Sequence, residues 1–339
     1  MSAETGQQDA VRRPDQPWGI LHAAHGMAAH KEGKQVNKGM MAAIAGLILT
    51  AVAPTPAGAA QRTGINTGAT SFFDGFGGSQ PGCVFIGYVG NANFDQFNGA
   101  DGNKAADFQL ESTYAIEQIA CTTEQQLFGG LLGWTLIVPF SGQDASPNPP
   151  LSTNGFGIGD VDVGVSLNFP PVIQDGRPVF AQGFGVDVLA PTGRFDATKA
   201  INPGNDYFSL ASFWKATWLP APGWEVSWRL NFIHNFEHEV GGAQLQNGDG
   251  MWANFTASRE IFKDFYFGLN GFWLTQFEGD KINGVEIAGT KQESLYIGPG
   301  FHYTIDPKNI INFNVYFSVY DTNAFSDGVI VNLQYIHAF

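Results

Sequence analysis

The feature that most constrains this chain of 339 residues is the strict alternation of polar and apolar residues along many short segments. In segment 309–320 the apolar positions are Ile311, Phe313, Val315, Phe317 and Val319. Segments 159–169 and 223–236 repeat the pattern. Successive side chains of a β-strand point to opposite faces, so a period of two predicts strands. Polar and charged residues are confined to one face of these segments, which predicts strands that separate a polar from an apolar environment.

The composition indicates which environment is apolar. Asp, Glu, Lys and Arg make up 14% of the chain, whereas a soluble globular protein averages roughly 25%. Segment 40–53 is the only stretch that approaches the roughly 20 consecutive apolar residues of a membrane helix. Apolar residues dispersed at a period of two are typical of a transmembrane β-barrel, because Lys or Arg facing the bilayer midplane costs about 2–4 kcal/mol.

We therefore predict an all-β fold, an antiparallel up-and-down barrel of about twelve strands in the bacterial outer membrane. The expected strands are 83–92, 106–120, 127–140, 157–169, 178–190, 206–219, 223–236, 250–262, 265–277, 291–305, 309–320 and 328–339. Long connections rich in Gly, Asn, Asp and Pro alternate with connections that are mostly tight turns. Outer-membrane barrels have long external loops and short periplasmic turns. A soluble β-sandwich has no reason to alternate in this way.

Both ends of the chain carry signals for export. Three lysines precede the apolar segment 40–53, and Ala57-Gly58-Ala59 follows it, as in a cleaved signal peptide. We place a leader at residues 1–59, with Met27, Met40 and Met41 as alternative starts; a short membrane anchor is the other interpretation. Residues 60–81 would form a short periplasmic segment or a plug, and residues 82–339 the barrel. The final strand ends on Phe339 and resembles the assembly signal of outer-membrane barrels.

The two cysteines of the chain lie near each other in the predicted topology. Cys83 opens the first strand and Cys121 follows the second, so both fall at the periplasmic ends of neighbouring strands. In an oxidising compartment we expect a disulfide between them, with two free thiols as the alternative.

Five segments, taken in order, carry a resemblance to a known family. They are 157–160 (Gly-Ile-Gly-Asp), 189–196 (Leu-Ala-Pro-Thr-Gly-Arg-Phe-Asp), 220–225 (Pro-Ala-Pro-Gly-Trp-Glu), 277–284 (Phe-Glu-Gly-Asp-Lys-Ile-Asn-Gly) and 296–300 (Tyr-Ile-Gly-Pro-Gly). Together they resemble the outer-membrane barrel family associated with the meta-pathway of phenol degradation, over nearly all of residues 80–339. The cysteine pair and the acidic tract 103–126 depart from it. The resemblance implies uptake of hydrophobic small molecules in aromatic catabolism, but no functional residue carries over.

The lumen of a twelve-stranded barrel is wider than one that side chains fill and narrower than the aqueous channel of a large barrel. We expect a narrow substrate path through it. The residues expected to line this path are Asp160, Asp162, Asp187, Lys215, Glu225, Arg229, Phe272, Tyr296, His302 and Tyr316. Lys215 and Glu225 lie on neighbouring strands near their shared turn, so we expect a cross-strand ion pair. A register shift of one residue would turn all of these side chains outward.

Other chemistry is disfavoured. Residues 234–238 match the letters of the His-x-x-Glu-His zinc motif. On a strand the two histidines would stand about 13 Å apart and could not share a metal. We expect no metal, no cofactor and no enzymatic activity. The net charge of −14 argues against a nucleic-acid partner.

The leading hypothesis is an outer-membrane channel for small hydrophobic or aromatic solutes. Its expected partners are outer-membrane lipid, the barrel-assembly machinery and the solute itself. Two alternatives stay open. One is a barrel-embedded hydrolase, in which His302 would pair with a carboxylate, and the other is a closed structural or adhesive barrel.

Overall fold

The computed structural model describes residues 66–146 and 152–339. Its wall is built from twelve long strands. They are β1 (Gly82–Asn98), β2 (Lys104–Leu127), β3 (Gly130–Ser146), β5 (Val161–Asn168), β7 (Arg177–Ala190), β8 (Ser209–Trp218), β9 (Trp224–Asn235), β12 (Gly250–Phe262), β13 (Phe265–Gln276), β16 (Glu293–Asp306), β17 (Asn309–Thr322) and β18 (Ala324–Ala338). The leader predicted for residues 1–59 lies outside the described residues.

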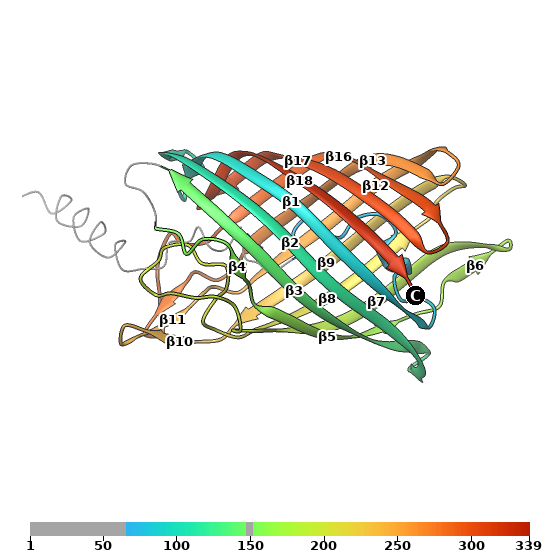
Figure 1. Cartoon of the computed structure of the whole chain (residues 1–339), viewed down its shortest axis with the longest axis horizontal. Coiled ribbons are helices and arrows are strands. Elements are labelled where there is room, and N and C mark those ends of the chain that lie inside the picture. Colours follow the sequence, from blue (N-terminus) through green and yellow to red (C-terminus); the bar gives the residue numbers. More distant parts are fainter. Residues whose placement is uncertain (1–65, 147–151) are drawn as a thin grey trace, which may run out of the picture. The chain divides into compact units, whose positions relative to one another are not determined.

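Every long strand pairs antiparallel with two neighbours, and β1 pairs with both β2 and β18. The pairing of β2 with β3 completes the circle, so the sheet is a closed barrel. Two short strands, β4 (Gly157–Ile158) and β6 (Val172–Gln174), pair with β3 and β7. Figure 1 shows the tilted strands of this wall. The prediction of an all-β barrel with twelve strands is confirmed.

The connections at the two ends of the barrel differ in length. At one end the chain turns over two residues at Phe128-Gly129, Lys263-Asp264 and Pro307-Lys308. Phe128 and Gly129 both have positive φ angles, 51° and 83°, as the type I′ turn of a two-residue hairpin requires. The other end carries the segments 152–156, 191–208, 236–249 and 277–292. By the rule for outer-membrane barrels, these loops face the outside.

The outer loops contain a second small sheet that the sequence did not indicate. It consists of β10 (His238–Val240), β11 (Ala243–Gln246), β14 (Lys281–Ile282) and β15 (Val285–Glu286). Figure 1 shows β10 and β11 at the left end of the barrel, and the C-terminus towards the right end.

Several predicted boundaries were wrong; strand β1, for example, ends at Asn98 and not at residue 92. Strand β2 continues to Leu127, so Cys121 lies within it and not after it. There it faces Cys83 of β1, and the two form a disulfide with a Cα–Cα distance of 4.1 Å. The predicted loop 321–327 is reduced to one residue, Asn323, between β17 and β18. Asn323 has a positive φ of 47°, a conformation that asparagine tolerates better than most residues.

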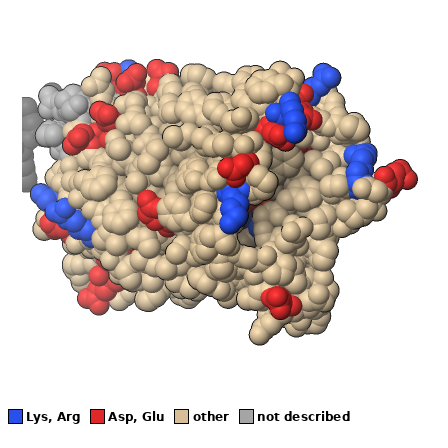
Figure 2. Space-filling model, turned by 45° about the vertical axis from the view of Figure 1, so that its right-hand side comes forward, with Lys and Arg blue, Asp and Glu red and all other residues tan. Residues whose placement is uncertain are grey.

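The outer surface of the barrel is mostly apolar. Val163 and Val165 on β5, Leu230 and Phe232 on β9, and Phe317 on β17 are exposed at the alternate positions of their strands. Uncharged residues cover most of the surface seen in Figure 2, and charged side chains gather mostly near its two ends. Trp218 and Trp224, which flank the turn 219–223, are exposed where an interfacial aromatic girdle belongs.

The described part of the chain also contains a 3-10 helix, η2 (Asp74–Phe76), in the segment that precedes β1. Within residues 66–146 and 152–339, no helix is long and apolar enough to cross a membrane.

Candidate functional site

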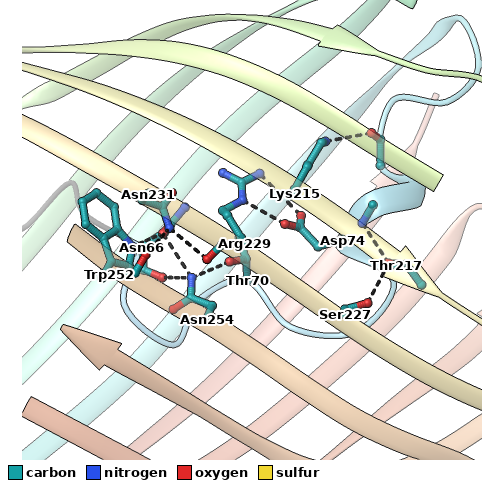
Figure 3. A network of polar contacts seen from close by, with 12 residues as sticks. Asn66, Thr70, Asp74, Lys215, Thr217, Ser227, Arg229, Asn231, Trp252 and Asn254 are labelled. Carbon is teal, nitrogen blue, oxygen red and sulfur yellow. Dashed lines mark hydrogen bonds and ion pairs between the residues drawn. The ribbon is translucent and has the colours of Figure 1, made fainter. Parts of the chain in front are cut away.

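Residues 66–81 lie inside the barrel and contact the lumen-facing side chains of several strands; we call this segment the plug. Its first half is held by Asn254 on β12 (Figure 3). The Asn254 amide donates to the Asn66 carbonyl at 2.7 Å and to Thr70 Oγ1 at 2.6 Å. Its Oδ1 accepts a hydrogen bond from the backbone N–H of Gly68 at 2.9 Å. One buried side chain therefore satisfies three polar groups of the plug.

Two aromatic side chains fix the same half of the plug. The indole N–H of Trp252, on β12, donates to Asn66 Oδ1 at 2.7 Å. The hydroxyl of Tyr316, on β17, donates to the Gly68 carbonyl at 2.7 Å. Gly68 has a φ of +70°, and a Cβ there would lie 2.9 Å from the Tyr316 ring. Only glycine fits this position without strain.

Charged residues hold the second half of the plug against β8 and β9. Arg229 Nε donates to Asp74 Oδ2 at 2.8 Å, and both side chains are largely buried. Lys215 Nζ donates to the Gly77 carbonyl at 2.8 Å. The Phe73 N–H donates to Glu225 Oε1 at 3.1 Å. Figure 3 shows Arg229 and Lys215 reaching the plug from neighbouring strands.

Gly75 lies flush against the wall of the barrel. Its N–H donates to Thr217 Oγ1 at 2.9 Å. A Cβ added to Gly75 would stand 2.2 Å from the Thr217 nitrogen and 2.5 Å from the Ala181 carbonyl oxygen. Since both are backbone atoms of the sheet, they cannot move aside, and a larger residue would push η2 away from β7 and β8.

His302 packs against the plug. Its ring lies 5.0 Å from the Phe73 ring and 5.9 Å from the Phe72 ring, measured between centroids. Its Nδ1 lies 2.7 Å from Asn312 Oδ1, and its Nε2 lies 3.1 Å from Thr304 Oγ1. The hydrogen-bond partners of this histidine are thus an amide and a hydroxyl, whereas the hydrolase hypothesis required a carboxylate.

A cavity of about 550 Å³ lies beside the plug. Its apolar side is formed by inward-facing residues of β1, β2 and β3. They include Val84, Ile86, Tyr88, Ile116 and Ile137. Its polar side includes Asp162, Asp187, Lys215 and Arg229. In the described part of the chain, no group of three or more His, Cys, Asp and Glu residues could hold a metal ion.

Strands β1 and β2 expose several polar residues on the outer face of the barrel. Their inward faces carry the apolar cavity residues, whereas Asn93, Glu111, Thr113 and Glu117 are exposed on the outer face. The amide of Asn91 donates to Glu111 Oε1 at 3.3 Å across the two strands. For β1 and β2, the expectation that polar residues face only the lumen was therefore wrong.

Asp160 was predicted to line the path, but it lies between β4 and β5 and holds the outer loops together. Its carboxylate accepts hydrogen bonds from the N–H of Gly193 at 3.0 Å and from the N–H of Asn205 at 2.8 Å. Burial raises the pKa of Asp160 to about 6, although these hydrogen bonds oppose the shift.

The predicted ion pair between Lys215 and Glu225 was also wrong. Lys215 faces Arg229 across β8 and β9, and Glu225 lies two residues nearer the turn than Ser227, which faces Thr217. Glu225 Oε2 accepts a hydrogen bond from Ser258 at 2.6 Å, in addition to its bond with the plug. Both charges are thus committed to other partners.

The three predicted aromatic residues form a packed cluster in the lumen. The rings of Phe272 and Tyr296 stack with centroids 4.9 Å apart, and Tyr316 meets Phe272 edge-on at 5.6 Å. Phe94 and Phe325 join the same buried cluster. Their burial fills this part of the lumen with side chains.

Three of the wall residues that hold the plug, Asn254, Trp252 and Thr217, were missed in the sequence. Asn254 and Thr217 occupy polar positions of alternating strands, so the period of two could have placed them in the lumen. Asp74 and Gly75 precede the first strand, where no periodicity marks them.

The closed wall, the apolar outer surface and the asymmetric loops define the protein as a bacterial outer-membrane β-barrel. The profile of a family described as the "MetA-pathway of phenol degradation" matches residues 94–333. The chain belongs to this family.

Solved structures are similar at the level of the fold. The COG4313 outer membrane channel from Pseudomonas putida F1 matches with a TM-score of 0.66 and 16% identity, over 76% of this chain and 96% of that one. The translocator domain of the autotransporter NalP from Neisseria meningitidis matches with a TM-score of 0.42 and 10% identity, over 89% and 97%. The TodX monoaromatic hydrocarbon channel matches with a TM-score of 0.41 and 8% identity, over 76% and 90%. No curated protein matches the sequence.

Proposed function

We propose that the protein is an outer-membrane channel for the uptake of small hydrophobic or aromatic compounds, and that the plug keeps it closed to water and ions. The observation that carries this proposal is the apolar inward face of β1, β2 and β3 beside the plug. A porin for polar solutes has a polar interior. Here Ile86, Ile116 and Ile137 give the lumen an apolar side.

The size of the cavity agrees with a small solute. Ligand pockets have volumes of roughly 300–1,000 Å³, and the cavity measures about 550 Å³. Burying an apolar solute against this wall is favourable by about 25 cal/mol per Å² of surface removed from water. The membership of the chain in a family linked to phenol degradation supports an aromatic solute.

The test is uptake by cells whose intact outer membrane carries the protein. Lipopolysaccharide slows hydrophobic solutes, so uptake of radiolabelled toluene should be faster in cells with the barrel than in cells without it. The uptake of arabinose, a polar solute of similar size, should be little faster in cells with the barrel. Equal uptake of toluene in both kinds of cell would refute the proposal.

Two variants connect the flux with the wall. Ile116→Thr makes the cavity wall more polar, and it should lower toluene uptake severalfold because about 1 kcal/mol of apolar burial is lost. Ile119→Thr is the matched control, since Ile119 lies on the same strand but is exposed on the outer face and does not line the cavity. Gly75→Ala should raise arabinose uptake, because the added methyl group cannot fit between the plug and β8.

The alternatives predict other outcomes. A closed structural or adhesive barrel would pass no solute in any of these variants. A hydrolase would show ester or peptide turnover that disappears in His302→Ala.

A further inference from the structure

Two carboxylates on neighbouring strands point into the cavity. Asp162 lies on β5 and Asp187 on β7, and both line the cavity. Asp162 is only 3% exposed. Within the described residues, the Oδ1 atom of each carboxylate is buried without a hydrogen-bond partner. Buried polar atoms normally have a partner, so two such acceptors beside one cavity require an explanation.

The cations near these carboxylates already bind the plug. Arg229 donates to Asp74 at 2.8 Å through Nε and at 3.4 Å through Nη2. Lys215 donates to the Gly77 carbonyl at 2.8 Å. In the described part of the structure, neither cation donates a hydrogen bond to Asp162 or Asp187. The site therefore has spare acceptors.

The wall makes room for one of the carboxylates. Gly164 lies opposite Asp187 in the pairing of β5 and β7. A Cβ at Gly164 would fall 1.8 Å from Asp187 Oδ1. Any other residue at position 164 would occupy the place that this carboxylate takes.

We propose that Asp162 and Asp187 form a recognition site for the polar end of the solute. This inference rests on the proposed function and narrows its substrate class to hydrophobic molecules that carry one hydrogen-bond donor, a hydroxyl or a protonated amine. The donor binds these two carboxyl groups, while the apolar body lies against Tyr88, Ile116 and Ile137 in the same cavity. Anionic solutes of the same size are rejected because they would bring a second acceptor against acceptors.

The test compares four solutes of nearly equal size: toluene, benzyl alcohol, benzylamine and benzoate. Their binding to the detergent-solubilised mature protein is measured by equilibrium dialysis, with protein-free micelles as the blank. We expect benzyl alcohol and benzylamine to bind at least fivefold more tightly than toluene, and benzoate to bind most weakly. Hydrogen bonds to an ionised group are the stronger ones, so benzylamine should bind best.

The double variant Asp162→Asn/Asp187→Asn keeps the size of both side chains and removes their charge. It should weaken benzylamine binding about tenfold or more and leave toluene binding unchanged. Asp321→Asn is the matched control, because Asp321 is equally buried but lies outside the cavity. Heat-modifiable migration on a gel shows whether each variant is folded. If the double variant does not fold, the single variant Asp162→Asn replaces it in the binding measurement.

Two outcomes separate this inference from the proposed function. If toluene binds but benzylamine binds no better, or if the double variant keeps the preference, the recognition site is refuted and the channel stands. If none of the four solutes binds the wild-type protein above the blank, the proposed function itself fails.

Discussion

Replacing Asp74 with asparagine should release the plug, because Asp74 is the partner of a buried cation. The side chains of Arg229 and Asp74 are only 13% and 15% exposed, and their ion pair is 2.8 Å long. Removing one partner of a buried ion pair costs about 3–5 kcal/mol, since the other charge stays buried without compensation. Arg229 belongs to the wall and Asp74 to the plug, so this cost falls on the docked state. At 1.4 kcal/mol per tenfold change, the ratio of docked to released plug should fall by roughly 100-fold or more.

Single-channel recording in planar bilayers measures this ratio as an open probability. The wild-type protein should be closed for nearly all of the recording, and Asp74→Asn should open frequently. Arg229→Gln should open as well, and the double variant should recover part of the closed time because no buried charge is left alone.

Glu278→Gln is the control. Glu278 and Lys281 also form a 2.8 Å ion pair, but in an outer loop, with side chains 43% and 27% exposed. Exposed pairs contribute only about 0–1 kcal/mol, so the open probability should stay near that of the wild type. The reasoning is refuted if deletion of residues 66–80 opens the channel while Asp74→Asn leaves it closed.

Two further predictions concern the disulfide and the outer loops. The double variant Cys83→Ser/Cys121→Ser should lower the free energy of unfolding by about 4 kcal/mol, the chain-entropy value for a closed loop of this length. Urea titration measures this difference. Two free thiols in the purified wild-type protein would contradict the prediction. The pKa of Asp160 is raised to about 6 from 3.8. The protonated carboxyl of Asp160 therefore favours the folded loops. This stabilisation is fully present below about pH 4 and is lost as the pH rises through 6. Protease cleavage of the loops should be slower at pH 4.5 than at pH 7.5 in the wild type, and Asp160→Asn should reduce the difference. A cleavage rate independent of pH would contradict this.

The twelve strands could be predicted because each carries its own signal, a period of two bounded by turn residues. Their ends were less predictable. Residues 121–126 are mostly polar and were predicted as a turn, yet they continue β2 towards the hairpin at Phe128-Gly129. At the opposite end of the barrel, the composition of residues 321–327 predicted a loop. The structure turns at the single residue Asn323 instead, because asparagine tolerates a positive φ.

The docking of the plug could not be predicted in the same way. A period of two shows which residues face the lumen, but it does not show which group across the lumen each one meets. Asp74 and Arg229 are 155 residues apart. Lys215 and Glu225 were expected to pair because they are near in sequence. The register and the plug give each of them another partner.

The division of the lumen would explain how the proposed channel is closed to ions and still passes apolar solutes. The polar contacts with the plug come from β8, β9, β12 and β17, whereas the apolar wall of the cavity belongs to β1, β2 and β3. A solute that follows the apolar wall contacts β1, β2 and β3, whereas Asp74 is held by Arg229 of β9. Breaking that ion pair should therefore raise ion conductance by a much larger factor than toluene uptake. If ion conductance and toluene uptake rose by the same factor in Asp74→Asn, ions and toluene would share one path. The plug would then have to leave the lumen before either could pass.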